Sequence, residues 1–348
     1  MVWEKVYTER GEFEKTCRTL GKRLRGLTYR EAIKEALALI MKQDKSVFIM
    51  GEGVDDPTGV FGTTLGLQKI FGKERVFDTP IAENTITGMA LGAAITGMKP
   101  IVVHMRMDFL LLAMDQIVNH ISKWRYMFGG KLKIPLVIRT IIGRGWGSAA
   151  QHSQSLQGLF LHIPGLKIVI PASPYDVKGL LIASIEEGTP IIFIEHRWLY
   201  EHIGYVPKGI YSVPIGKGIV RKEGKDLTVV GISYMVFESL KAAEVLREEN
   251  IDIEVIDIRT LKPLDEEIIF KSVKKTGKLI IADTGWLTGG VTAEISARVT
   301  SNIFKYLKAP VIRIASPDCP TPSSPVLEKA FYPGKEEIVS AVKRIFKE

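Results

Sequence analysis

The chain has 348 residues, of which 46% are hydrophobic and 25% charged, and its formal net charge is +8. This composition is typical of a globular protein with about two domains and excludes an intrinsically disordered chain. The only two cysteines, Cys17 and Cys319, are too few for a disulfide framework or a cysteine-rich metal site. We therefore expect a reducing, cytoplasmic compartment.

The N-terminal segment 1–26 mixes basic and acidic side chains and has no apolar stretch behind it, so it predicts an extension rather than a secretory signal. The densest apolar run, 109–114, lies between Asp108 and Asp115. A membrane-spanning helix needs roughly 20 apolar residues, so we expect no membrane span.

Charge is unevenly distributed, because segment 116–175 has no acidic residue and seven lysines and arginines. One interpretation is that strands and glycine-rich loops leave little room for carboxylates. The other is a positive field that faces an anionic ligand or an acidic partner chain. Composition does not separate these two. A nucleic-acid partner is not expected, because no basic-aromatic interleaving or binding motif accompanies the charge.

Short apolar runs alternate with helical patterns along the chain. Runs that are apolar on both faces are typical of parallel sheets covered by helices, so we expect an α/β fold with two parallel-sheet domains. The predicted strands are residues 47–50, 101–104, 135–140, 167–170, 191–195, 227–232, 253–258, 279–282 and 311–314. The predicted helices are residues 29–42, 176–187, 236–249 and 291–307.

The alternating pattern is weakest over 197–223, which contains Pro207, Pro214 and several glycines. We place the domain boundary there, since both flanking parts then have ordinary domain sizes. The predicted organisation is an extension 1–26, an N-terminal domain 27–196, a linker 197–223 and a C-terminal domain 224–348.

Gly51-Glu52-Gly53 follows the first predicted strand and resembles the start of a phosphate-binding loop. The pattern G-x-G-x-x-G is not completed, because position 56 is Asp56, and no G-x-x-x-x-G-K-[ST] occurs. We interpret the segment as a turn at the end of a strand. The chain therefore has no complete phosphate-binding loop of its own.

A helix rich in glycine and alanine is predicted to begin near Glu83. Each helical glycine costs about 1 kcal/mol relative to alanine, so Gly88, Gly92 and Gly97 suggest close helix packing, for example across a subunit interface. On local grounds, Glu83 complements the positive end of this helix, a contribution of roughly 0.3–1 kcal/mol.

His152 follows a glycine-rich loop, 143–147, that suits a segment approaching a ligand. Its unperturbed pKa of about 6.5 suits a general acid or base, and a structural histidine is nearly as good an interpretation on local grounds. No metal held by this chain is expected, because there is no H-E-x-x-H, no C-x-x-C and no carboxylate-rich loop.

Several blocks occur together in one order: 27–33 (LTYREAI), 78–83 (DTPIAE), 92–100, 114–117 (MDQI), 126–130 (YMFGG), 150–154 (AQHSQ), 164–169 (PGLKIV), 257–263 (DIRTLKP) and 288–290 (TGG). With these blocks the chain resembles the beta subunits of thiamine-diphosphate-dependent 2-oxo acid dehydrogenases, the pyruvate, branched-chain oxo acid and acetoin dehydrogenase group. The resemblance extends from about residue 27 to the C-terminus. It implies a pyrimidine-binding domain followed by a transketolase C-terminal domain.

The resemblance also implies roles for four side chains. Glu83 matches the glutamate that hydrogen-bonds a ring nitrogen of the cofactor's aminopyrimidine. Met105 and Phe109 match residues that pack against that ring, and His152 matches the active-site histidine. Glu83 is thereby implied as a catalytic residue, an interpretation that outweighs the helix-end role.

The family's diphosphate and magnesium motif belongs to a separate alpha subunit, in agreement with the missing phosphate loop. The resemblance therefore implies that thiamine diphosphate binds between two chains, with magnesium held mainly by the partner. The implied assembly has two alpha and two beta chains, with a lipoyl acyltransferase as a further partner.

The chain departs from the family pattern at several positions. His104 and Arg106 lie in 103–109 (VHMRMDF), where the family usually has a run of the type EFMTFNF, and thus place polar or cationic groups beside the pocket. Glu187 and Thr189 stand where the family often holds a monovalent cation with Asp and Asn. These changes suggest a 2-oxo acid larger or more anionic than pyruvate.

The expected function is decarboxylation of a 2-oxo acid and transfer of the acyl group to lipoamide. Two alternatives remain open at this point. One is a subunit of a split transketolase-like enzyme that transfers a carbon fragment to an aldehyde. The other is a scaffold subunit of the same fold without catalytic chemistry.

Overall fold

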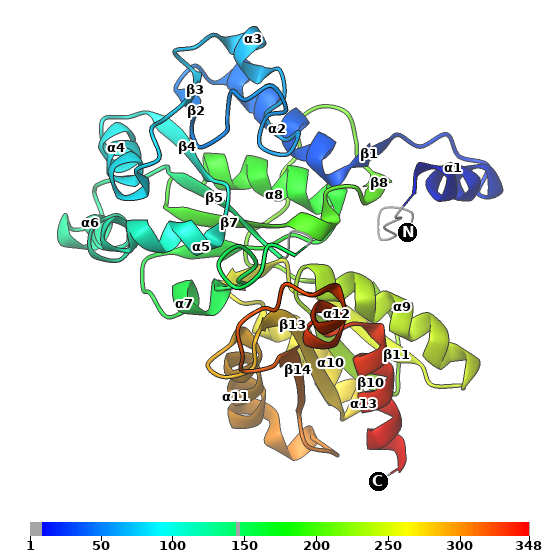
Figure 1. Cartoon of the computed structure of the whole chain (residues 1–348). Helices are drawn as coiled ribbons and strands as arrows, with labels where there is room; N and C mark the ends of the chain where they lie inside the picture. Colours follow the sequence, from blue (N-terminus) through cyan, green and yellow to red (C-terminus); the bar gives the residue numbers. More distant parts are fainter. Residues whose placement is uncertain (1–8, 144–146, 348) are drawn as a thin grey trace. The chain divides into compact units, whose positions relative to one another are not determined.

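The computed structural model describes residues 9–143 and 147–347. They form two compact units (Figure 1). Unit 1 comprises Met1–Ile142 and His162–Ile215, and unit 2 comprises Gly143–Leu161 and Gly216–Glu348. Two sequence predictions fall partly outside the described residues: positions 1–8 of the extension and 144–146 of the glycine-rich loop.

Unit 1 is built on six parallel strands in the order β6-β7-β5-β4-β2-β3. Every residue of β2, β5 and β7 is buried, which confirms the prediction of strands that are apolar on both faces. The strands are β2 (Val47–Gly51), β3 (Val76–Asp78), β4 (Lys99–His104), β5 (Val137–Ile142), β6 (Lys167–Val169) and β7 (Ile191–His196).

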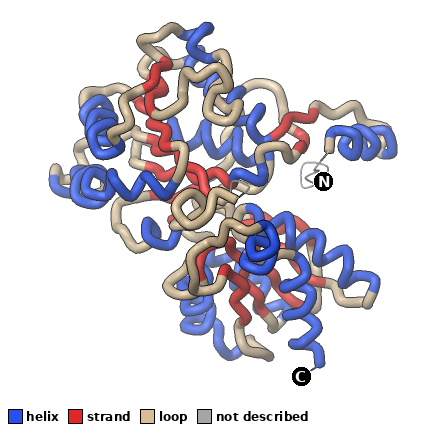
Figure 2. The backbone as a smooth tube through the Cα atoms, in the orientation of Figure 1, coloured by secondary structure: helices blue, strands red, loops and turns tan. Residues whose placement is uncertain are grey.

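Helices cover both faces of this sheet (Figures 1 and 2). On one face α2 packs against α8, and elsewhere α4 packs against β4 and α5 against β5. The helices of unit 1 are α1 (Arg10–Thr19), α2 (Tyr29–Gln43), α3 (Leu67–Phe71), α4 (Glu83–Ile95), α5 (Met107–Leu110), α6 (Trp124–Met127) and α8 (Pro174–Glu186), with short 3₁₀ or π segments at Leu111–Ala113, Gln116–Ile121 and Arg197–Leu199.

Local sequence signals determine where the two long helices begin. Thr28 caps α2 in a capping box, in which its side chain accepts from the Glu31 N–H and Glu31 accepts from the Thr28 N–H at 2.7 Å. Ser173 caps α8, with Pro174 at the first helical position. The block LTYREAI is therefore in part a helix-start signal.

The N-terminal extension and the predicted linker both contain regular structure. Phe13 and Cys17 of α1 are buried together with Ile203. Strand β1 (Gly26–Thr28) pairs antiparallel with β8 (Ile203–Tyr205), which lies inside the segment predicted as a linker. These strands are too short to give a periodic sequence pattern, which explains why the segment looked irregular.

Unit 2 has a five-stranded sheet in the order β14-β13-β10-β11-β9, parallel except for the edge strand β9. Its strands are β9 (Ile219–Lys222), β10 (Leu227–Gly231), β11 (Ile253–Asp257), β13 (Leu279–Trp286) and β14 (Ile312–Ser316), and the short strand β12 (Thr260–Lys262) lies outside this sheet. Its helices are α7 (Gln157–Leu161), α9 (Tyr234–Glu248), α10 (Glu266–Thr276), α11 (Val291–Ile303), α12 (Pro325–Phe331) and α13 (Lys335–Lys347), with a 3₁₀ turn at Phe304–Tyr306. Helices α9 and α13 pack against each other, as do α10 and α11.

The segment that contains His152 belongs to unit 2, although it lies between the two stretches of unit 1 in the sequence. We predicted one continuous N-terminal domain over 27–196, and the compact units divide the chain differently at 143–161. The domain boundaries themselves stay a prediction. Among the described helices, none is both long and apolar enough to cross a membrane.

Candidate active site

Three neighbouring parallel strands of unit 1 end at the same level. Gly51 of β2 lies opposite Asp78 of β3 on one side and opposite Val103 of β4 on the other. The residues that follow these strands therefore meet at one edge of the sheet. In open α/β sheets, ligands bind outside the carboxyl ends of the strands, and this edge is the candidate site.

Glu83 is the first residue of α4 and is only 6% exposed. The preceding residue, Ala82, makes no side-chain cap at this helix end. Among the described residues, none forms a hydrogen bond with the Glu83 carboxylate. A buried carboxylate that has no hydrogen-bond partner among the described residues is suited to hydrogen-bond a polar atom of a ligand.

Glu52 is a second buried carboxylate at this edge, with 9% of its surface exposed. Gly51 makes the inward turn possible, because its φ is +135° and a Cβ there would lie 2.2 Å from the Val103 carbonyl oxygen. The Glu52 N–H then bonds the same oxygen at 3.1 Å, and its carboxylate accepts from the Met105 N–H. Burial and the charge of Glu83 raise the pKa of Glu52 to about 7.

Sequence analysis missed Glu52. The turn that we predicted at 51–53 is present, but its central side chain is buried and lies within electrostatic range of Glu83. The letters G-E-G are the same whether the glutamate faces solvent or the interior. Only the glycine before it, at a strand end where backbones approach closely, is a signal in hindsight.

The two side chains predicted to pack against the cofactor ring both follow β4. Met105 is half-buried, and its Sδ lies 3.0 Å from the position that a Cβ on Gly53 would take. Phe109 is half-buried on α5. The Met105 N–H thus bonds Glu52, whose carboxylate lies within electrostatic range of Glu83. Phe109 lies four residues further along the chain, on α5.

His104 does not line the pocket as a cationic group. It is fully buried, its Nε2 lies 3.0 Å from Thr87 Oγ1, and its Nδ1 lies 3.9 Å from Glu52 Oε1. Burial lowers the pKa of His104 to about 4, so the ring is neutral near pH 7. Of the two expected kinds of group, polar or cationic, His104 is therefore the polar one, whereas Arg106 is half-exposed just before α5.

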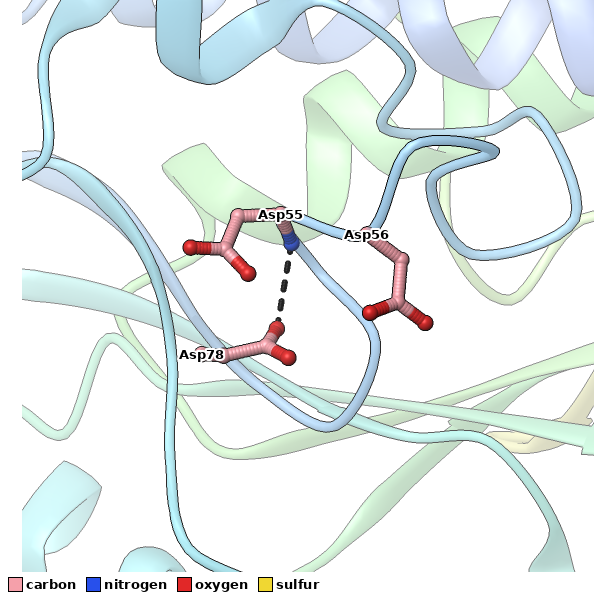
Figure 3. A group of neighbouring side chains, drawn as sticks. All are labelled: Asp55, Asp56 and Asp78. Atoms are coloured by element: carbon pink, nitrogen blue, oxygen red, sulfur yellow. Dashed lines mark hydrogen bonds between the residues drawn. The ribbon is translucent and has the colours of Figure 1, made fainter.

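Three aspartates lie close together beside this edge. The carboxylate oxygens of Asp55, Asp56 and Asp78 lie within 4.8 Å of one another, and all three residues are exposed. Figure 3 shows the Asp55 N–H donating to Asp78 Oδ1, at 3.0 Å. Burial, together with the neighbouring aspartates, raises the pKa of Asp78. Oxygen donors of this kind suit a divalent cation, but the cluster is also explained by a loop whose side chains satisfy each other.

His152 lies in unit 2 and is exposed, with its N–H bonded to the Ala149 carbonyl at 3.4 Å. The segment after it is anchored by Gln157, whose Nε2 donates to both carboxylate oxygens of Asp283 at 2.8 and 3.0 Å. Burial raises the pKa of Asp283 to about 6. Sequence analysis missed this anchor, because the two residues lie far apart in the chain.

The described structure thus brings Glu83 and Met105 to one edge of unit 1, with Phe109 close behind Met105 in the sequence. His152 belongs to the other unit. Glu187, which stands where the family often holds a monovalent cation, forms an ion pair with Lys167.

Comparisons with known proteins identify the two domains and the fold. Residues 25–202 match the transketolase pyrimidine-binding domain, and residues 216–338 match the transketolase C-terminal domain. A solved structure described as a split-gene transketolase, an inactive beta4 tetramer, has a TM-score of 0.74 over 93% of this chain and 99% of that one. Its sequence identity is 24%, so this likeness concerns the fold.

Curated relatives are closer in sequence. The chain is 44% identical to the beta subunit of acetoin:2,6-dichlorophenolindophenol oxidoreductase from Bacillus subtilis, over 91% of this chain and 96% of the relative. It is 43% identical to the pyruvate dehydrogenase E1 component subunit beta of Rickettsia felis, over 92% and 98%. It is 40% identical to the 2-oxoisovalerate dehydrogenase subunit beta of Bacillus subtilis, over 92% and 98%. The chain therefore belongs to the family of 2-oxo acid dehydrogenase beta subunits, built from the transketolase pyrimidine-binding and C-terminal domains.

Proposed function

We propose that this chain pairs with a separate alpha chain to form a thiamine-diphosphate enzyme that decarboxylates a 2-oxo acid and passes the acyl group to lipoamide. The observation that carries the proposal is Glu83: a buried carboxylate, without a hydrogen-bond partner among the described residues, at the ligand-binding edge of the sheet. This environment fits a hydrogen bond to a ring nitrogen of an aminopyrimidine.

Thiamine diphosphate, when bound, supplies the carbon nucleophile and electron sink that decarboxylation requires. The contribution of this chain is to hold the pyrimidine end. Glu83 would hold or release a proton at the ring nitrogen, and Met105 and Phe109 would pack against the ring and exclude water. His152 would act as acid or base toward the substrate, since its side chain is exposed and lies near a glycine-rich loop.

The diphosphate and its magnesium would be held mainly by the alpha chain. This chain has no complete phosphate-binding loop, and phosphate contacts are charge-assisted bonds that supply much of the affinity for such a cofactor. Two alpha and two beta chains would form the assembly. A lipoyl acyltransferase would carry the lipoamide that accepts the acyl group.

Unit 1 offers an exposed apolar surface for such a partner. Met89 on α4 is 56% exposed, Leu112 after α5 is 63% exposed, and Tyr126 on α6 is 88% exposed. Large apolar side chains at this level of exposure mark interaction surfaces when they gather on neighbouring elements. Helix α4 contacts the Leu111–Ala113 segment directly.

Calorimetric titration of thiamine diphosphate in the presence of magnesium tests the two-chain proposal. The isolated chain should bind weakly or not at all, and a mixture with the candidate alpha chain should bind with at least about 100-fold higher affinity, equivalent to roughly 2.7 kcal/mol. Tight binding and full turnover by the isolated chain would contradict the requirement for a partner.

Product analysis then separates the reaction types. The assembled enzyme, given pyruvate, branched 2-oxo acids and acetoin in turn, should convert one of them with formation of acyl-lipoamide. A new carbon–carbon bond on addition of an aldehyde would favour the split transketolase alternative. The absence of any turnover with bound cofactor would favour the scaffold alternative.

A further inference from the structure

Three buried polar side chains form a row below the start of α4, and the reaction proposed above does not use them. Glu52 follows β2, His104 is the last residue of β4, and Thr87 lies on α4 one turn after Glu83. All three belong to unit 1, and all are buried. His104 Nε2 lies 3.0 Å from Thr87 Oγ1, within hydrogen-bond distance.

The other contact in the row is not a completed hydrogen bond. Glu52 Oε1 and His104 Nδ1 are both buried, and neither atom has a hydrogen-bond partner among the described residues. They face each other at 3.9 Å. Two acceptors in this position would be unfavourable, whereas a proton between them needs only a closing of about 1 Å to make an ordinary bond.

The surroundings determine where that proton lies. The charged groups that act on Glu52 are the carboxylates of Glu83 and Asp78, and both disfavour a further negative charge. Burial disfavours charge on His104 as well. A neutral carboxylic acid facing a neutral imidazole is therefore the arrangement that fits this interior.

We propose that Glu52 and His104 form a neutral pair, in which the protonated Glu52 carboxyl donates a hydrogen bond to His104 Nδ1, keeping its proton, and His104 Nε2–H donates a hydrogen bond to Thr87 Oγ1. The pair keeps Glu52 uncharged, so Glu83 is left as the carboxylate of this edge that changes charge toward the cofactor. His104 is in this sense a positioning residue. The effect of the pair on the cofactor site rests on the proposed role of Glu83, whereas the existence of the pair does not.

The Nδ1 atom of His104 is the acceptor of the hydrogen bond from the Glu52 carboxyl. Phenylalanine, which the family pattern has at this position, would fill similar space without a nitrogen that can accept this hydrogen bond. The departure from the pattern thus has a chemical consequence. It predicts that Glu52 loses its proton at a higher pH in this chain than in a His104→Phe variant.

Nuclear magnetic resonance of the full chain, without cofactor, tests the pair. The chain has six histidines, so labelling histidine with nitrogen-15 and carbon-13 gives few signals, and His104→Phe identifies the one of interest. The His104 ring should be neutral, with its proton on Nε2. Its Nδ1 signal should shift with an apparent pKa near 7, as Glu52 gives up its proton.

In Glu52→Gln this titration step should vanish, because the amide has no proton to lose in this range, while the tautomer is retained. Glu74→Gln, at an exposed position, is the matched control and should keep the step unchanged. A step that persists in Glu52→Gln, a wild-type signal without any step between pH 5.5 and 8.5, or a proton on Nδ1 would overturn the pair. If His104→Phe does not fold, replacing the other histidines one at a time assigns the signal.

A Glu83→Gln variant tests the link to the cofactor site in the same spectra. Removing this negative charge should move the His104 step to lower pH by about half a unit or more. An unmoved step would contradict the coupling to Glu83 while leaving the pair intact. Because these spectra need neither cofactor nor alpha chain, failure of the two-chain proposal is recognised separately, by calorimetry.

Discussion

Arg139 and Glu195 form a doubly hydrogen-bonded ion pair inside unit 1. The Arg139 Nε donates to Glu195 Oε1 at 2.6 Å and its Nη2 donates to Glu195 Oε2 at 3.0 Å, from the neighbouring strands β5 and β7. Both side chains are at most 1% exposed. Arg139 Nη2 also donates to Thr63 Oγ1 at 3.0 Å, and the Tyr200 hydroxyl donates to Glu195 Oε2 at 2.8 Å, so the pair ties a loop to two strands.

Breaking this pair from one side should destabilise unit 1 strongly. Arg139→Leu leaves the Glu195 charge buried and uncompensated, and we expect a loss of about 3–5 kcal/mol in the free energy of unfolding. Denaturant unfolding measures this loss. The double variant Arg139→Leu/Glu195→Leu should recover part of it, because no buried charge remains.

The matched control is an exposed pair. Glu294→Gln removes one of the two carboxylate partners of Arg298 on the surface of α11, the other being Glu266, and should change stability by no more than about 1 kcal/mol. If Arg139→Leu costs as little as this control, the buried pair does not hold the strands together.

Glu83→Gln should leave folding intact and reduce turnover of the assembled enzyme by at least about 100-fold. The amide has nearly the size of the carboxylate, but it cannot hold or release a proton at the cofactor ring. Turnover and thermal melting should be measured on the same preparation. Asn84→Ala, on the exposed side of the same turn, is the control. Unchanged turnover in Glu83→Gln would contradict the proposed role.

Asp283 should give the stability of unit 2 a dependence on pH. Burial raises its folded-state pKa from 3.8 to about 6, so the term that favours folding is fully present below about pH 4 and is lost as the pH rises through 6. The total is about 3 kcal/mol. Asp283→Asn cannot ionise, so its stability relative to wild type should rise between pH 4 and 6 and then level off.

Denaturant unfolding of both proteins at pH 4, 5, 6 and 7 measures this difference. Equal pH dependence of wild type and Asp283→Asn would mean that folding does not raise the pKa of Asp283, and would contradict the prediction. The difference in stability between the two proteins is used because other carboxylates titrate over the same interval. Their contributions are the same in both proteins and cancel in the difference.

The sheet strands could be predicted because continuous apolar runs are what a strand buried on both faces needs. All the predicted strands coincide with observed ones, and the largest difference is in β13, which continues to Trp286. Strands β1, β3, β8, β9 and β12 were missed, since strands this short leave no long apolar run in the sequence. The pairing of distant segments, such as Gln157 with Asp283, has no local sequence signal at all.

The candidate site was predictable only in part. Glu83 could be singled out because a carboxylate at the start of a small-residue helix also matched a family block. His104 was noticed as a departure, but its burial depends on α4 covering the end of β4, which is a tertiary fact. Glu52 could not be distinguished from an ordinary turn residue, because only the fold decides which way a turn faces.

His152→Ala should slow a step after cofactor binding by about 100-fold and leave cofactor affinity unchanged. His152 is exposed, and a solvent-accessible imidazole is suited to act as acid or base on the substrate. Single-turnover decarboxylation and acyl transfer should be timed separately. His162→Ala, another exposed histidine, should behave as wild type. A variant in which only cofactor affinity falls would make His152 structural.

Gly92→Phe should prevent assembly without harming the fold of the isolated chain. A Cβ built on Gly92 meets no atom within 4 Å, and the neighbouring Met89 is 56% exposed, so α4 has room on this face until a partner covers it. Removing a helical glycine should leave the free energy of unfolding of the isolated chain equal or raise it by up to about 1 kcal/mol, so its melting temperature should not fall. Sedimentation of the mixture with the alpha chain should show free subunits. Gly11→Phe, another helical glycine with open space around it, should assemble as wild type does. Assembly of Gly92→Phe with unchanged affinity would place the partner on a different face of unit 1.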